Sequence, residues 1–129
     1  MKKQARAMRV GMSDLELLDR KVTRDGGALR YLEGAAYGLA TSLFRSEIVP
    51  GSGPEPHTHA YNEIFVIEAG QGRYRVGTES IDAGAGDIVI VPAGQPHEFV
   101  NIGPASLRHV AIHENAERAA SMPTALPDL

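Results

Sequence analysis

The sequence predicts an all-β domain in the form of a sandwich or a barrel. About eight short apolar segments follow one another, and turns rich in glycine or proline separate them at regular spacing. With 129 residues, the chain is long enough for one domain with a single hydrophobic core. We therefore expect one body built from short strands.

All but the last of the predicted strands are followed within three residues by glycine or proline. The predicted strands are residues 29–33, 38–49, 64–67, 73–76, 79–83, 87–91, 97–101 and 106–113. Between two of these strands, residues Ala69–Gly72 predict a hairpin turn. These boundaries divide the chain into an N-terminal arm (1–27), a barrel (28–113) and a C-terminal tail (114–129).

The composition argues against several classes of partner and chemistry. A net charge of -3 gives no attraction to nucleic acid or to an anionic membrane. Cysteine is absent, which excludes disulfides, thiolate ligands and a cysteine nucleophile. The apolar runs are too short to span a bilayer, and no apolar segment of a secretory signal follows the basic first residues. We therefore expect a cytoplasmic protein with no nucleic-acid or membrane partner.

Histidine and glutamate side chains gather around the third predicted strand. His57 and His59 are two residues apart, so in an extended segment both imidazoles point to the same side. Glu63 follows four residues later, and two imidazoles and a carboxylate aimed at one point suit a divalent cation. A fourth donor is needed, and the best candidate is His97, just after the apolar segment 87–91. The sequence thus predicts a mononuclear site of three histidines and one glutamate.

The same residues carry a resemblance to the cupin family. The first cupin motif is similar to residues 51–70, with its fixed positions at Gly51, His57, His59, Glu63 and Gly70. The second is similar to residues 86–101, with its fixed positions at Gly86, Pro92, Gly94, His97 and Asn101. Over roughly residues 28–113 the chain resembles small single-domain cupins of the quercetin-dioxygenase-like kind. The resemblance implies a double-stranded β-helix, or jelly-roll barrel.

The resemblance also implies a cofactor and a class of chemistry. Four protein donors leave coordination positions of a divalent ion open, and the candidates are Fe, Mn, Ni, Zn and Cu. The implied function is a metal-dependent enzyme that acts on a small oxygenated organic molecule, by dioxygenase-like or isomerase/lyase-like chemistry. In the dioxygenase-like members the metal-bound glutamate can serve as a base, which assigns a catalytic role to Glu63. The alternative is a non-catalytic cupin that binds or senses a small molecule.

Three aromatic residues are further candidates for the site. Tyr61 lies between the two histidines and Glu63, and we assign it a catalytic role in which its phenol orients the substrate. Phe65 follows Glu63 by two residues, and Phe99 follows His97 by two residues. Alternate residues of a strand share a face, so both rings are expected to line the substrate pocket beside the metal. A phenylalanine at position 65 counts against the cupins that cleave sulfonium compounds, which place a tyrosine near this position.

Charged and titratable residues on other predicted strands are weaker candidates. Among several strand arginines, Arg45 is the candidate to bind a substrate carboxylate. His109 and His113 lie on the last predicted strand and are interpreted as packed or exposed histidines. The alternative for these two is a fifth metal ligand or a proton shuttle.

The faces of two predicted strands indicate self-association. Residues 38–49 and 64–67 carry apolar side chains on both faces, whereas a small sandwich buries only one face of each strand. A second subunit would remove the remaining apolar surface from water. Small cupins are usually dimers, so the resemblance agrees with the homodimer that we predict.

Overall fold

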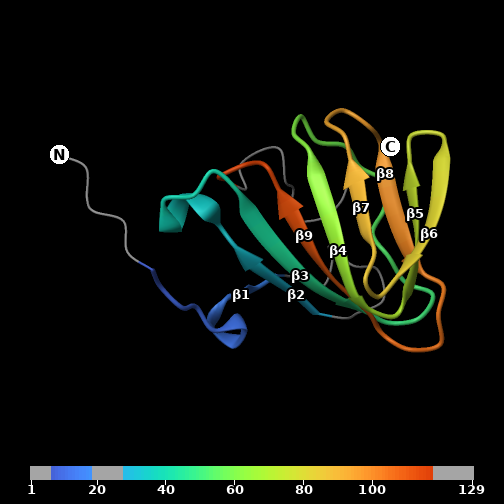
Figure 1. The fold of residues 1–129 in the computed structure, drawn as a ribbon, viewed down its shortest axis with the longest axis horizontal. Coiled ribbons are helices and arrows are strands. Elements are labelled where there is room, and N and C mark those ends of the chain that lie inside the picture. The colour runs from blue at the N-terminus through green and yellow to red at the C-terminus, as the bar shows by residue number, and fades with distance from the viewer. Residues whose placement is uncertain (1–6, 19–27, 118–129) are drawn as a thin grey trace.

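Two antiparallel β-sheets form the body of the protein in the computed structural model, which describes residues 7–18 and 28–117 (Figure 1). The larger sheet has the strand order β1-β2-β3-β9-β4-β7 and the smaller one β6-β5-β8. The larger sheet contains β1 (Glu16–Leu17), β2 (Ala28–Leu32), β3 (Ser42–Ile48), β9 (Leu107–His113), β4 (Glu63–Ala69) and β7 (Ile88–Val91). The smaller sheet contains β6 (Glu79–Gly84), β5 (Gln71–Val76) and β8 (His97–Asn101).

Alternating burial along the strands places one face of each sheet inside. In β3, β8 and β9 every second residue is buried, because successive side chains of a strand point to opposite faces. Rings from both sheets meet in the interior: Phe65 of β4 lies 5.0 Å from Tyr74 of β5 and 5.6 Å from Phe99 of β8, measured between ring centroids. The prediction of an all-β jelly roll is confirmed, and all eight predicted strands are present.

The predicted hairpin at residues 69–72 is wrong. β4 ends at Ala69 and β5 begins at Gln71, but β4 pairs with β7 and β9, whereas β5 pairs with β6 and β8. Gly70 therefore carries the chain from one sheet to the other. Its φ is 83°, and a Cβ at this position would lie 2.5 Å from Ser106 O, so only glycine fits without strain.

The described part of the N-terminal arm contacts the body through a short strand pair. Glu16 and Leu17 pair with Tyr31 and Arg30 of β2, and Leu18 is buried in the core. Two short 3-10 turns, η1 (Met12–Asp14) and η3 (Gly34–Tyr37), complete the described elements. Residues 1–6 and 19–27 of the predicted arm and 118–129 of the predicted tail lie outside the described residues. Within the described ranges, no helix has the length and apolar character needed to cross a membrane.

Candidate metal centre

The four predicted ligands come from both sheets and from the loop that precedes β4. Glu63 is the first residue of β4 and His97 the first residue of β8. The backbones of His57 and His97 exchange two hydrogen bonds, of 3.0 Å and 2.8 Å, and the Gly94 N–H donates to His59 O at 2.8 Å. These contacts attach the loop that carries His57 and His59 to the start of β8. The ligand geometry therefore depends on how the loop and the smaller sheet fit together.

A close approach between backbones holds the same loop in place further upstream. A Cβ at Gly53 would lie 1.9 Å from Phe99 O, so no larger residue fits there without a shift of backbone. Ser52 O accepts from the Asn101 N–H at 2.9 Å, and the Asn101 amide group donates to Ile48 O and Ala105 O at 2.9 and 2.8 Å. Asn101 of the second motif is thus a structural residue that joins the loop, β3 and the turn before β9.

The four side chains converge on one buried point. Their potential ligand atoms all lie within 4.8 Å of one another, and all four residues are buried. Glu63 Oε1 is 3.1 Å from His97 Nε2 and 3.3 Å from His59 Nε2. The predicted set of His57, His59, Glu63 and His97 is therefore brought together as expected.

The backbone fixes the protonation of two of these imidazoles. His57 Nδ1 lies 3.0 Å from Glu55 O, and His97 Nδ1 lies 2.9 Å from Gln95 O. A carbonyl oxygen can only accept, so in both rings Nδ1 carries a proton and Nε2 is the atom that faces the cluster. Metal-binding histidines are oriented in the same way when a carbonyl accepts from one ring nitrogen and leaves the other for the metal. The residues present therefore fit a divalent cation.

Burial and mutual charge set the ionisation of the cluster. Burial, followed by the nearby charge of His97, lowers the pKa of His57 to about 4, which keeps this ring neutral at physiological pH. Burial alone would raise the pKa of Glu63, but the charge of His113 and hydrogen bonds from His113, His59 and His97 hold it well below its usual range. Burial is the largest influence on His97 and would lower its pKa, but the hydrogen bond to Glu63, the charge of Glu63 and the hydrogen bond to the Gln95 backbone together outweigh it and leave the pKa raised. An ionised carboxylate among imidazoles is the form that binds a cation.

Of the other predicted site residues, the structure brings three near the cluster and leaves one away from it. The Tyr61 ring stacks on His59, with centroids 4.8 Å apart. Phe65 and Phe99 are buried in the next layer of the interior. Arg45 lies on the opposite face of β3 from buried Phe44, and its guanidinium is 3.6 Å from the Glu68 carboxylate. The position of Arg45 does not support the predicted contact with a substrate.

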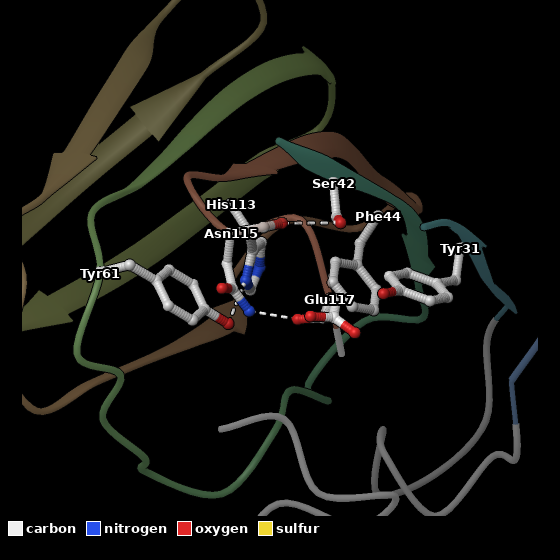
Figure 2. A pocket seen from close by; sticks show the side chains of 7 residues that line it. All are labelled: Tyr31, Ser42, Phe44, Tyr61, His113, Asn115 and Glu117. Carbon is white, nitrogen blue, oxygen red and sulfur yellow. Dashed lines mark hydrogen bonds between the residues drawn. The ribbon is translucent and has the colours of Figure 1, made fainter. Parts of the chain in front are cut away.

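His113 was interpreted from the sequence as a packed or exposed histidine, with a fifth ligand or a proton shuttle as the alternative, and it is buried beside the cluster. In the structure it pairs directly with Glu63 in the sheet register, and its Nε2 lies 3.2 Å from Glu63 Oε2. Its Nδ1 is 2.9 Å from the Tyr61 hydroxyl, as the dashed line in Figure 2 shows. The sequence does place His109 and His113 on the same face of β9, because alternate residues of a strand share a face. The pairing of β9 with β4 was not readable from the sequence.

A narrow gap adjoins this side of the cluster. It is too narrow to hold a water molecule and is therefore a crevice between packed side chains, not a ligand pocket. Its lining residues, drawn in Figure 2, are Tyr31, Ser42, Phe44, Tyr61, His113, Asn115 and Glu117. Ser42 Oγ donates to Asn115 O at 2.8 Å and so holds the segment after β9 beside the gap.

Comparison with known proteins places this arrangement in a family. A model of the cupin domain matches residues 44–113. An uncharacterized protein of Streptomyces coelicolor is 28% identical over 87 residues, which cover 67% of this chain and 79% of that protein.

Two solved structures illustrate the likeness of fold. A predicted oxalate decarboxylase from Thermotoga maritima superposes with a TM-score of 0.72 at 23% identity, covering 82% of this chain and 97% of that one. Bacillus subtilis oxalate decarboxylase, described for its Mn(II) centres, superposes with a TM-score of 0.76 at 19% identity, covering 90% of this chain and 31% of that one. At these identities the likeness concerns the fold.

Proposed function

The chain belongs to the cupin domain family, and from this premise we propose that it is a metal-dependent enzyme acting on a small oxygenated organic molecule. The observation that carries the proposal is the convergence of four buried donors, His57, His59, Glu63 and His97, within 4.8 Å of one another. Four donors leave positions open on an ion that prefers five or six, which is typical of catalytic sites. A divalent ion would supply Lewis acidity, or oxygen activation if it is redox-active.

The residues around the donors suit such a reaction. Phe65 and Phe99 form an apolar layer next to the cluster, which would exclude competing water from a bound substrate. Glu63 would hold a proton taken from the substrate, because it is the one carboxylate in the cluster. Tyr61 is half-buried beside His59 and presents a hydroxyl for orienting a substrate. The reaction type, dioxygenase-like or isomerase/lyase-like, belongs to this proposal as two alternatives.

Metal content tests the proposal directly. Protein purified without a chelating column and reconstituted with Mn, Fe, Ni, Zn or Cu should bind one ion per chain. The His59→Ala variant should bind much less, because it removes one buried donor. Equal metal content in both proteins, or none in the wild type, would contradict the site. A structural relative with Mn(II) centres makes Mn the first ion to test.

We also propose that two copies of the chain associate through the outer face of the larger sheet. Ile88 and Ile90 of β7 are 62% and 65% exposed. Register neighbours extend this surface, because Ile64 pairs with both Ile90 and Ile112 and Val66 pairs with Ile88. A second copy would cover an apolar surface that water otherwise contacts.

Light scattering of the wild type at high micromolar concentration should therefore give the mass of a dimer. Ile90→Lys should shift it toward the monomer, while Ile81→Lys on the smaller sheet, at another exposed isoleucine, should not. A monomeric wild type would contradict this assembly.

A further inference from the structure

A continuous line of contacts runs from the Tyr61 hydroxyl to the predicted metal ligands. The hydroxyl lies 2.9 Å from His113 Nδ1, and His113 Nε2 lies 3.2 Å from Glu63 Oε2. The other oxygen of Glu63, Oε1, is the one near His97 and His59. The two oxygens of the carboxylate therefore have different partners: one faces the predicted ligands and the other faces His113.

The hydrogen atoms in this line can be assigned from chemistry. An ionised carboxylate only accepts hydrogen bonds, so His113 Nε2 must carry the proton that points to Glu63 Oε2. When the His113 ring is neutral, Nδ1 is an acceptor and the Tyr61 hydroxyl donates to it. Tyr61 thus selects the tautomer of His113 in which Nε2 is a donor. His97 differs in the partner of Nδ1: a carbonyl that only accepts fixes its Nδ1 as the donor, so a neutral His97 has Nε2 free for a metal ion. A neutral His113 can keep its proton on Nε2 because the Tyr61 hydroxyl can donate to Nδ1, and in this form it stays a donor to Glu63 and not a ligand.

Packing holds both residues of the line in these orientations. His113 is 3% exposed, and its ring lies 4.7 Å from the ring of Phe44. The Tyr61 ring is nearly parallel to that of His59, at an interplanar angle of 3°. Figure 2 shows the two side chains directed toward each other from different segments of the chain. Their relative position is therefore determined by the fold and not by a freely rotating surface contact.

We infer that His113 and Tyr61 are positioning residues that hold Glu63 so that only Oε1 is presented to a metal ion. The inference rests on the proposed metal site and adds to it a specific way of orienting its carboxylate. Groups that hydrogen-bond to a ligand fix its orientation, and their loss typically weakens metal binding by about 10- to 100-fold. Without His113, Glu63 could turn and offer both oxygens to the same ion.

Two replacements of His113 by amides of different length separate positioning from general structural damage. In His113→Gln the amide N–H group reaches far enough to donate to Glu63 Oε2, whereas in His113→Asn the side chain is too short. A matched control is His109→Asn, which changes another buried histidine of β9 whose Nδ1 lies 2.7 Å from the Tyr74 hydroxyl. Affinity for Mn(II), measured by competition with a chelator, and the EPR spectrum of bound Mn(II) are the two readouts.

We expect His113→Asn to weaken Mn(II) binding by about 10- to 100-fold and to change the EPR spectrum. His113→Gln and His109→Asn should stay near the wild type in both measurements. Equal affinities and spectra for His113→Asn and His113→Gln would overturn the inference. So would a change of the same size in His109→Asn.

Tyr61→Phe provides a second test that does not depend on His113→Asn folding. It removes only the hydroxyl that selects the tautomer, and it should weaken Mn(II) binding by about two- to tenfold, the usual effect of one hydrogen bond. An unchanged affinity and spectrum would remove Tyr61 from the inference. A wild type that binds no divalent ion would instead contradict the proposed function, so the two failures are distinguishable.

Discussion

Two histidine–tyrosine pairs lie on the same inner face of β9 and have opposite surroundings. His113 contacts Tyr61 at 2.9 Å, and His109 contacts Tyr74 at 2.7 Å, in both cases through Nδ1. Beyond the ring, His113 Nε2 faces a carboxylate at 3.2 Å. His109 Nε2 has no hydrogen-bond partner among the described residues and is surrounded by aromatic rings.

The difference shows that the same two residue types serve different purposes according to what the facing strand supplies. Register pairs His113 with Glu63, but it pairs His109 with Ile67, two inward-facing levels further along the strands. Burial consequently lowers the pKa of His109 to about 4 and raises that of Tyr74. His113 and Tyr61, the outer pair, belong to the candidate metal centre, whereas His109 and Tyr74, the inner pair, belong to the core.

The largest effect should follow from changing the carboxylate that distinguishes the two pairs. Glu63→Gln keeps the shape of the side chain but leaves one acceptor oxygen, so either the metal ion or His113 loses its partner. We expect some metal and ligand binding to remain, and turnover of an identified substrate to fall at least about 100-fold because the base is absent.

The measurement is a screen of small oxygenated molecules with Mn, Fe, Ni and Zn in air, followed by kinetics on the variant. If ligands bind the wild type tightly and none is transformed, the non-catalytic binding module becomes the better description. Full activity in Glu63→Gln would contradict the assignment of Glu63 as the base.

Acid should destabilise the inner pair. The unfolded state of the chain binds a proton at His109 below pH 6.5, whereas the folded state does so only near pH 4. Stability due to this group is therefore complete above pH 6.5 and is lost as the pH falls toward 4. For this group linkage gives about 2 kcal/mol less stability at pH 5 than at pH 7.5.

Urea unfolding of metal-free protein at the two pH values measures this loss. His57, whose pKa is also lowered to about 4, contributes a similar loss, and His97, whose pKa is raised, contributes an opposite gain on acidification. The contribution of His109 is therefore the difference in pH dependence between the wild type and His109→Phe, and His109→Phe should lose about 2 kcal/mol less than the wild type. An unaltered pH dependence in His109→Phe would show that this histidine does not stay neutral in the folded protein.

The smallest effects should come from removing single hydroxyl groups. Tyr74→Phe leaves buried His109 Nδ1 without its partner and should cost about 1–3 kcal/mol of unfolding free energy. Tyr61→Phe should cost about 0.5–1.5 kcal/mol, because Tyr61 is only half-buried and water can replace its hydroxyl. Urea unfolding of the two variants at pH 7.5 compares these losses. A larger loss of stability in Tyr61→Phe than in Tyr74→Phe would contradict the assignment of Tyr74 to the core and Tyr61 to the site.

The double variant Tyr74→Phe/His109→Phe sharpens the comparison. It removes both polar partners from an aromatic layer, and a fully apolar replacement of a buried hydrogen-bonded pair can be nearly neutral. We expect it to be more stable than Tyr74→Phe alone. A double variant that sums the losses of the single ones would show that the two residues do not act as a pair.

The sequence was informative where a feature is local. His57, His59 and Glu63 could be identified together because their spacing alone puts the side chains on one side of a short segment. Which strands pair is a non-local property, and this explains why the hairpin was predicted wrongly and why the contact between His113 and Glu63 was not predicted. Glycines at positions 70 and 72 resemble a hairpin but lead to another sheet, and His113 becomes informative only when β9 is known to lie beside β4.

The position of Arg45 illustrates a different limit. Residues 42–48 alternate strictly in the structure, but in the sequence both sets of alternate positions contain apolar residues, so the inner face could not be chosen. Phe44 packs inward against Tyr31 and His113, and this directs Arg45 to the outside. The packing of these rings determines which face of β3 points inward. The pattern of hydrophobic residues along the strand does not show this, because it does not show which rings meet.

The origin of the ligands on two different sheets has a mechanical consequence. Glu63 begins a strand of the larger sheet and His97 begins a strand of the smaller sheet. An ion bound to both residues would therefore link the two sheets directly. Packing of the two sheets and binding of the ion are then thermodynamically linked. At a free ion concentration of 100 times Kd, binding would add about 2.7 kcal/mol to the free energy of unfolding. Loss of the ion would loosen the junction between the sheets before it loosened either sheet.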